Sequence, residues 1–147
     1  MKLIIWRSAT LNRCRTSGKV VNSMKGTQEY EMKINRSIEN LISSSEHSDL
    51  LRRYKNYIND YAVSSKYDYL KKVNYFLSGI NKDVKYVTID DITGYMASLE
   101  YREDGRRYSQ SYKISVYTAL KHLFSYLYTV GDIDSNPMDN IKRPKAF

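Results

Sequence analysis

Hydrophobic residues recur three or four positions apart in five segments of the chain, with polar residues between them. This spacing places the apolar side chains on one face of a helix. The five segments are residues 28–42, 50–61, 64–79, 88–99 and 109–131. Only residues 85–88 form a short candidate strand, because no longer stretch alternates between apolar and polar residues. The pattern therefore predicts an all-α fold, a bundle of four core helices with one additional N-terminal helix.

Small polar residues mark the expected helix starts, and a glycine marks an expected end. Ser64 or Ser65 can cap the helix that follows, and Gly79 is expected to end it. Thr88 and Asp91 have the spacing of a capping box, in which each side chain accepts a hydrogen bond from the other residue's backbone. These signals separate the middle of the chain into two helices.

The longest predicted helix begins at Ser109, which can cap it, and ends at Gly131. Opposite its apolar face runs a line of polar residues that is free to meet a partner. They are Ser111, Ser115, Thr118 and His122. We expect His122 to lie on the surface or next to that partner.

The formal net charge of +8 is distributed unevenly over the 147 residues. Residues 1–23 carry five bases and no acids, residues 24–48 have a net charge of −1, and residues 49–147 have a net charge of +4. A basic chain favours an acidic partner, most commonly a nucleic acid. We expect the segment 1–23 to be a disordered tail or an appended tag, or else a basic arm that adds phosphate contacts.

The chain offers little of what an active site requires. Its single cysteine, Cys14, excludes an internal disulfide and favours a reducing cytoplasm. Neither His47 nor His122 belongs to a metal-binding or nucleophile motif, and the chain has no glycine-rich phosphate loop. No apolar run reaches the roughly 18 residues that a membrane span needs. We therefore expect a cytoplasmic, non-catalytic protein that uses no metal or cofactor and contacts no membrane.

Tyrosine is frequent, with 15 residues, and several tyrosines occupy the apolar stripes. An amphipathic ring explains them as core residues, so none is assigned as a nucleophile. These tyrosines are Tyr54, Tyr57, Tyr61, Tyr95 and Tyr117.

The most distinctive motifs lie after residue 108. They are Ser109-x-x-Tyr112, Ala119-Leu120-Lys121-x-x-Phe124-x-Tyr126-Leu127 and Gly131-x-Ile133-x-x-Asn136-Pro137-x-x-x-Ile141-Lys142-x-Pro144-Lys145. Two earlier motifs are Ser65-x-x-x-Tyr69-x-x-x-Val73-x-x-Phe76 and Thr88-x-x-Asp91-Ile92-x-x-Tyr95-x-x-x-Leu99. In this order and spacing, residues 49–145 resemble the core-binding, SAM-like domain of the tyrosine recombinases, the phage integrase family.

This resemblance implies an orthogonal bundle of four core helices that forms half of a clamp around double-stranded DNA. The second and fourth core helices would lie against the major groove, and other protomers of the recombinase would touch this domain on DNA. The family carries catalysis on a separate domain. We therefore expect a non-catalytic fragment with a helix and linker at 24–48, a core-binding domain at 49–135, and a linker toward the catalytic domain at 136–147.

Candidate DNA contacts lie at two helix starts, residues 64–66 and 109–111, where backbone N–H groups and hydroxyls can donate to phosphate oxygens. Neighbouring lysines and a basic C-terminal tail add positive charge. The candidates are Ser64, Ser65, Lys66, Lys71, Lys72, Ser109, Gln110, Ser111, Tyr112, Lys113, Ser115, Lys121, Lys142, Arg143 and Lys145.

The resemblance itself carries over Ser65, Tyr112, Ser115 and Lys121. Tyr112 stands where the family commonly has threonine and Ser115 where arginine often grips DNA, and both departures bear on base-specific contacts. Each lysine or serine could equally be a solvated helix face or a cap. A helical protein–protein interaction module is the competing prediction. A helix-turn-helix regulator fits less well, because the connections at 80–87 and 102–108 are long.

Overall fold

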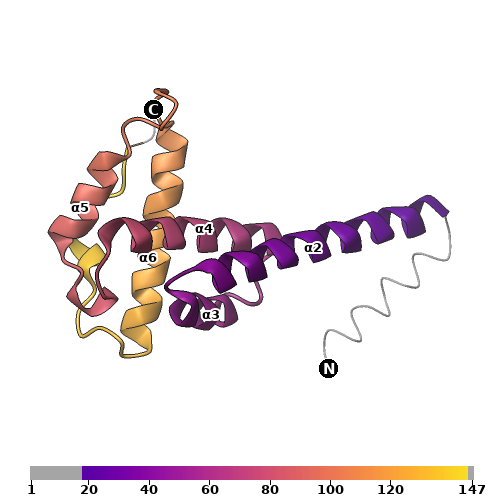
Figure 1. Cartoon of the computed structure of the whole chain (residues 1–147), viewed down its shortest axis with the longest axis horizontal. Helices are drawn as coiled ribbons and strands as arrows, with labels where there is room; N and C mark the ends of the chain where they lie inside the picture. The colour runs from indigo at the N-terminus through magenta and orange to yellow at the C-terminus, as the bar shows by residue number, and fades with distance from the viewer. Residues whose placement is uncertain (1–17, 146–147) are drawn as a thin grey trace.

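A computed structural model gives residues 18–145 of the chain, with side chains from residue 26 onward. Every regular element in this part is helical (Figure 1). The α-helices are α2 (Gly18–Ser44), α3 (Ser48–Tyr57), α4 (Val63–Ile80), α5 (Ile89–Ser98) and α6 (Gln110–Thr129), and 3₁₀ turns span Val84–Tyr86 and Pro137–Asn140. The prediction of an all-α fold, with four core helices and one additional N-terminal helix, is confirmed.

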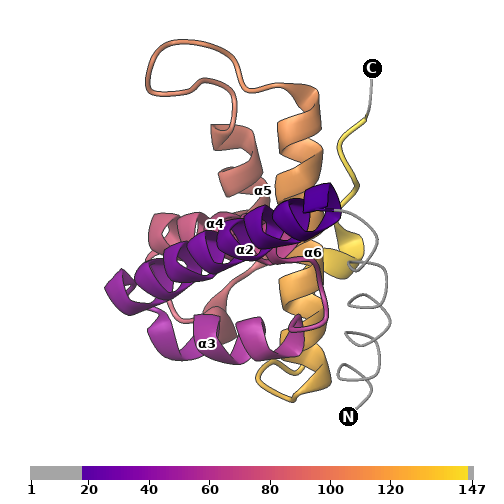
Figure 2. The same cartoon turned by 90° about the vertical axis from the view of Figure 1, so that its right-hand side faces the viewer.

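The other helices are arranged around α6. α4 crosses α6 steeply, α3 and α5 lie toward opposite ends of α6, and α2 runs alongside α4 (Figures 1 and 2). This crossing gives the orthogonal bundle that the resemblance implies. One face of α6 is buried from Val116 to Leu127, so the opposite face is free to form a surface.

Large aromatic side chains fill the centre of the bundle. Tyr54, Phe76 and Phe124 are completely buried. The ring of Phe76 meets those of Tyr95 and Phe124 edge-on, with centroids 5.0 and 5.9 Å away. Pairs of this kind contribute about 0.5–1.5 kcal/mol each beyond the burial of their area. The rings therefore join α3, α4, α5 and α6 in one core.

The additional helix α2 shares this core. Ile38 and Ile42 are completely buried in it. Glu39 accepts hydrogen bonds from Lys55 at 2.7 Å and from Arg52 at 3.2 Å, both on α3. Lys55, and after it Arg52, hold the pKa of the Glu39 carboxyl below its usual value. The second half of α2 is thus fastened to the bundle by both apolar packing and ion pairs.

α2 is longer than the periodic segment at 28–42 predicts. It begins at Gly18, so residues 18–23 of the segment expected to be a disordered tail are helical, and residues 1–17 lie outside the described residues. The first half of α2 extends away from the bundle (Figure 1). Near the middle of α2, Tyr30 and Met32 are 53% and 60% exposed. Periodicity missed residues 18–27, which lie before the predicted stripe begins at Tyr30.

Three predicted helix boundaries are confirmed. At the start of α5, Thr88 Oγ1 accepts from the Asp91 N–H at 3.2 Å, and the Asp91 carboxylate accepts from the Thr88 N–H at 2.9 Å. At the start of α6, Ser109 Oγ accepts from the Tyr112 N–H at 3.1 Å. After α6, Gly131 has a φ of 85°, the left-handed conformation that ends a helix.

The predicted boundaries of α4 are wrong at both ends. The helix begins at Val63 with Ala62 as its N-cap residue, so Ser64 and Ser65 lie in the first turn and do not cap it. It continues through Gly79 and stops at Asn81, which has a φ of 49° and is one of the few residues that tolerate this conformation. Gly79 packs closely on α5, since a Cβ there would lie 3.3 Å from the Tyr95 ring.

The candidate strand at residues 85–88 is also wrong. Val84–Tyr86 forms a 3₁₀ turn, and Asp83 caps it by accepting from the Lys85 N–H at 3.0 Å. A lone strand has no partner for its backbone groups here, whereas a turn satisfies them locally. The nearest approach to a strand pair in the described residues is a single bridge between Tyr101 and Arg107, which closes the polar turn before α6.

The segment after α6 folds back along the bundle. Met138 is buried in the core. The Tyr117 hydroxyl donates to the Ile141 carbonyl at 3.1 Å, and the Gln110 side chain donates to the Lys145 carbonyl. Residues 136–145 therefore return toward the start of α6 and bring the basic tail beside it.

Candidate nucleic-acid interface

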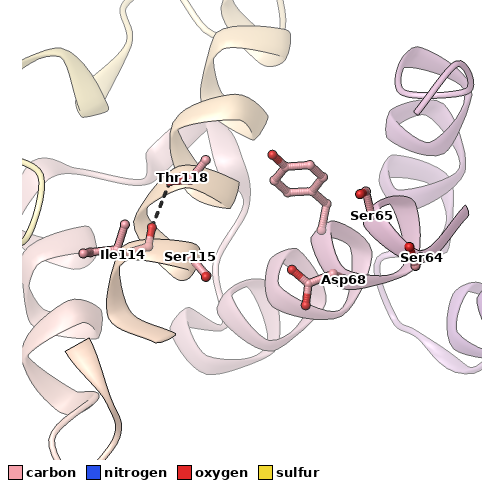
Figure 3. Close-up of a pocket in the computed structure, with 7 residues that line it drawn as sticks. Ser64, Ser65, Asp68, Ile114, Ser115 and Thr118 are labelled. Carbon is pink, nitrogen blue, oxygen red and sulfur yellow. Dashed lines mark hydrogen bonds between the residues drawn. The ribbon is translucent and has the colours of Figure 1, made fainter. Parts of the chain in front are cut away.

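A polar hollow lies between the start of α4 and the first half of α6 (Figure 3). Its α4 wall and its α6 wall come from parts of the chain that are far apart in the sequence. The lining residues are Ser64, Ser65, Asp68 and Tyr69 of α4, and Ile114, Ser115 and Thr118 of α6. Three predicted site residues, Ser64, Ser65 and Ser115, are thus brought together.

The α4 wall offers unused hydrogen-bond donors. Ala62 has no side-chain oxygen to cap the helix, and the first helical bond runs from the Lys66 N–H to the Ala62 carbonyl at 2.9 Å. Within residues 26–145, the backbone N–H groups of the first turn therefore have no side-chain acceptor, and they sit at the positive end of the helix dipole. Exposed Ser64 and Ser65 add two hydroxyls to the same turn. Such an end binds anions.

The α6 wall is polar but its hydroxyl protons are already used. Ser115 Oγ donates to the Ser111 carbonyl at 3.0 Å, and Thr118 Oγ1 donates to the Ile114 carbonyl at 2.9 Å (Figure 3). At the start of α6, the Ser109 oxygen is occupied as the cap. This wall therefore supplies small side chains and acceptor oxygens, and the donors for an anion come from α4.

An acid and a buried base lie at the side of the hollow. The side chain of Asp68 is 51% exposed and accepts a hydrogen bond from Lys72. Lys72 was a candidate for DNA contact, but it is buried, with its ammonium 5.5 Å from the centre of the Tyr112 ring. Its ammonium is thus directed at Asp68 and the Tyr112 ring, and its contact with DNA stays a prediction. Its charge offsets that of Asp68.

The other predicted lysines differ in how free they are. The Lys113 ammonium lies 3.6 Å from Glu100 with its side chain 22% exposed, and the Lys71 ammonium lies 4.5 Å from the Tyr67 ring centre. Lys66 is half-buried in the first turn of α4. Lys121 is exposed on α6 and makes no ion pair within residues 26–145.

The C-terminal candidates lie on the returning tail. Lys142, Arg143 and Lys145 are exposed and make no ion pair with any residue that the structure describes. Gln110, another candidate, is occupied by its bond to the Lys145 carbonyl and so holds the tail in place. The tail adds positive charge beside the start of α6.

Tyr112 lies apart from the hollow. Its ring stacks on that of Tyr108 at 4.7 Å and an interplanar angle of 12°, and burial raises the pKa of its hydroxyl. It lines a separate groove with Tyr75 of α4 and Tyr95 of α5, and most of the other lining residues lie in the connection between α5 and α6. The position that the resemblance assigns to Tyr112 is therefore not joined to Ser65 and Ser115 in the hollow.

His122 lies one turn beyond Thr118, in a cluster of tyrosines. Its Nδ1 is 2.8 Å from the Tyr54 hydroxyl and its Nε2 is 2.7 Å from the Tyr61 hydroxyl. Its ring stacks on Tyr69, with centroids 5.5 Å apart and an interplanar angle of 16°. Burial lowers the pKa of the imidazole. Rings from α3, from α4 and from their connection cover part of His122, which is half-buried. That it lies next to a partner stays a prediction.

The tyrosines of α3 do not all belong to the core as predicted. Tyr54 is completely buried, whereas Tyr57 and Tyr61 are 47% and 37% exposed. α3 ends at Tyr57, so Tyr61 falls on the connection to α4 and turns toward the surface. Helical spacing within a single segment could not reveal that the segment ends early.

Within residues 18–145 no helix is both long and apolar enough to cross a membrane. In the same part of the chain, no three His, Cys, Asp or Glu side chains gather as a possible metal site.

No protein-family model matches this sequence, and no curated protein matches it. Among solved structures, the chain is similar to an integrase from mycobacterium phage Brujita, with a TM-score of 0.57 and 20% sequence identity. The similarity covers 67% of this chain and 33% of the integrase chain, so this chain spans about a third of that protein. At this identity the comparison establishes a shared fold, an all-helical domain of the kind found in that integrase.

Proposed function

We propose that this chain binds double-stranded DNA as the non-catalytic core-binding domain of a site-specific tyrosine recombinase. DNA phosphates bind at the start of α4, and the exposed face of α6 lies against the adjoining major groove. Other protomers of the recombinase meet this domain on the same DNA. In the family that the sequence resembles, cleavage and rejoining of DNA belong to a separate domain.

The uncapped start of α4 is the observation that carries this proposal. A helix end with unpaired N–H groups and two exposed serines suits a phosphate, because both kinds of group donate to its oxygens. Across the hollow, the α6 wall carries the small side chains of Ser115 and Thr118. Small residues allow a phosphate backbone to approach both helices.

Four bases on α6 and on the tail beside its start make no ion pair with any residue from 26 to 145. Lys121 lies on α6, and the tail carries Lys142, Arg143 and Lys145 to the start of that helix. Contacts of this kind dominate affinity for DNA and weaken steeply with salt. With about four to six phosphate contacts, we expect roughly micromolar binding at moderate salt.

The test is binding of a fluorescent DNA duplex, measured by anisotropy across a salt series. The Ser64→Asp/Ser65→Asp variant puts two negative charges on the α4 wall. Acids in the first turn of a helix stabilise it, so this variant is expected to stay folded. We expect its affinity to fall tenfold or more, because the new carboxylates repel phosphate.

Lys85→Glu is the matched control. It also lowers the net charge by two, but Lys85 is exposed on the 3₁₀ turn after the far end of α4. We expect this variant to bind DNA nearly as well as the wild type. If both variants lose affinity for the duplex equally, net charge alone explains the loss, and the hollow is rejected as the DNA-binding site. A folded wild-type chain that does not bind duplex at low salt would reject DNA binding.

A protein-interaction module remains the second candidate because of α2. Near its middle, α2 carries exposed Tyr30 and Met32, a type of surface common at protein interfaces. Self-association that resists high salt, seen in sedimentation and removed by Tyr30→Ser/Met32→Ser, would favour this function. DNA binding would instead weaken steeply as salt is raised.

A further inference from the structure

Resting on the proposed DNA-binding function, we infer that Tyr61 is a further phosphate-contacting residue and that Tyr54 and His122 turn its hydroxyl proton outward. Tyr61 lies on the connection between α3 and α4, directly before the uncapped start of α4. Neither helical spacing nor charge in the sequence predicts a phosphate contact at Tyr61. The evidence for it is a chain of hydrogen bonds between α3, α6 and the connection from α3 to α4.

The chain begins at Tyr54, whose hydroxyl proton can go to one place only. Tyr54 is completely buried, and within the described residues its hydroxyl has His122 Nδ1 as its hydrogen-bond partner, at 2.8 Å. A buried hydroxyl that keeps its proton away from an acceptor loses a hydrogen bond and is costly. Tyr54 therefore donates to Nδ1, which must be unprotonated to accept.

The imidazole then has a single neutral tautomer. With Nδ1 as the acceptor, the proton of neutral His122 is on Nε2, because one ring nitrogen of a neutral histidine donates and the other accepts. Nε2 is 2.7 Å from the Tyr61 hydroxyl oxygen, so it donates to that oxygen. Stacking of the imidazole on Tyr69 holds the ring in the orientation that both bonds require.

Tyr61 is left with its proton free. Its oxygen already accepts from His122, so its own proton points away from the imidazole, and the side chain is 37% exposed. Hydrogen bonds in a chain polarise one another, which makes the last donor stronger. A phosphate oxygen is an acceptor without protons and suits this donor.

The Tyr61 hydroxyl also lies where a phosphate would pass. His122 lies one helical turn beyond Thr118 of the hollow, and Tyr69 both lines the hollow and packs on the rings of His122 and Tyr61. The outward donor therefore lies next to Tyr69, at the end of the hollow that faces His122. It extends the α4 wall by one contact.

The first measurement is nitrogen NMR of His122 in the free, full chain, well above pH 6.5 so that the imidazole is neutral. The inference requires the proton on Nε2. A proton on Nδ1 would overturn it, since Nε2 would then accept the Tyr61 proton and leave no outward donor. This result does not depend on DNA.

The second measurement compares Tyr61→Phe with Tyr57→Phe in duplex binding by anisotropy. Tyr57 is a matched control, because it is a half-exposed tyrosine of the same cluster whose hydroxyl makes no hydrogen bond within the described residues. We expect Tyr61→Phe to weaken binding about fivefold or more, as for the loss of one hydrogen bond to a charged group, and Tyr57→Phe to leave binding unchanged.

The outcomes separate the two proposals. If the wild type binds the duplex, and Tyr61→Phe and Tyr57→Phe bind it with equal affinity, the role of Tyr61 is rejected and the DNA-binding proposal stands. Absence of wild-type binding would reject DNA binding and, with it, the phosphate contact. The thermal stabilities of Tyr61→Phe and Tyr57→Phe are also compared. Equal stabilities would show that weaker binding by Tyr61→Phe comes from a lost contact and not from unfolding.

Discussion

His122 is the residue whose protonation matters most to this fold. Both of its ring nitrogens are engaged by tyrosine hydroxyls, and burial lowers its pKa. The unfolded chain, where the pKa is near 6.5, binds more protons than the folded chain in the window below that value. The neutral imidazole therefore stabilises the fold at higher pH, and this contribution is lost as the pH falls.

We accordingly expect the free energy of unfolding to decline as pH drops below about 6.5, until the lowered folded pKa is passed. His122→Gln, whose amide does not titrate, should remove this component while keeping a polar side chain. Urea unfolding of both proteins at pH values from about 5 to 7.5 measures it. Parallel pH profiles would contradict the assignment.

Asp68 places a negative charge in the proposed phosphate site while it pairs with the buried Lys72. Asp68→Asn removes a negative charge beside the phosphate path but leaves a buried ammonium without its counter-charge. We expect affinity for duplex to rise about threefold and the free energy of unfolding to fall by about 1–2 kcal/mol. Anisotropy and urea unfolding measure the two effects.

The double variant Asp68→Asn/Lys72→Met is the control for this trade. An apolar side chain of similar length can replace a buried base without a desolvation cost. Stability should therefore recover while the gain in affinity persists. A gain in affinity that disappears in the double variant would mean that Lys72, and not Asp68, acts on DNA.

At the scale of elements, α4 and α6 start differently. α6 is capped by Ser109 and α5 by a capping box, whereas α4 starts at Ala62 without a cap. A missing cap lowers helix stability by about 1 kcal/mol, and the free N–H groups it leaves suit an anion. The start of α4 is therefore less stable than its sequence could make it, which is typical of binding sites.

Ala62→Ser tests this cost. The new hydroxyl should accept from the first-turn N–H groups, raise the free energy of unfolding by about 0.5–1 kcal/mol, and weaken duplex binding two- to threefold by competing with phosphate. Thr88→Ala is the opposite case, since it removes a cap on α5 and should lower stability without changing affinity. Unchanged affinity in Ala62→Ser would argue against phosphate at this helix end.

At the scale of the whole molecule, α2 is half core and half extension. Ile38 and Ile42 are completely buried against the bundle, while Tyr30 and Met32 of the same helix are largely exposed. The bundle therefore depends on a helix that lies before its first predicted core segment.

Ile38→Ala should lower the free energy of unfolding by about 2–4 kcal/mol through the cavity it leaves. Met32→Ala, at an exposed position of the same helix, should change it by less than about 0.5 kcal/mol. Thermal and urea unfolding followed by circular dichroism measure both. Similar small effects in the two variants would mean that α2 is not part of the core in solution.

The sequence by itself determined the helical class, the order of the helices and three of their boundaries. Apolar spacing and the caps at Thr88, Ser109 and Gly131 depend on residues within one or two turns, so they can be read locally. The sequence also predicted Ser64, Ser65 and the small polar face of α6 as candidate contacts. It did not predict that they lie together.

Only the tertiary structure decided which candidates meet. The crossing of α4 over α6 brought Ser64, Ser65 and Ser115 together and left Tyr112 outside. The same packing buried Lys72 and joined His122 to tyrosines from α3 and from the connection to α4. Local patterns cannot encode these pairings, because the partners lie on different helices and their distances depend on how the whole core is packed.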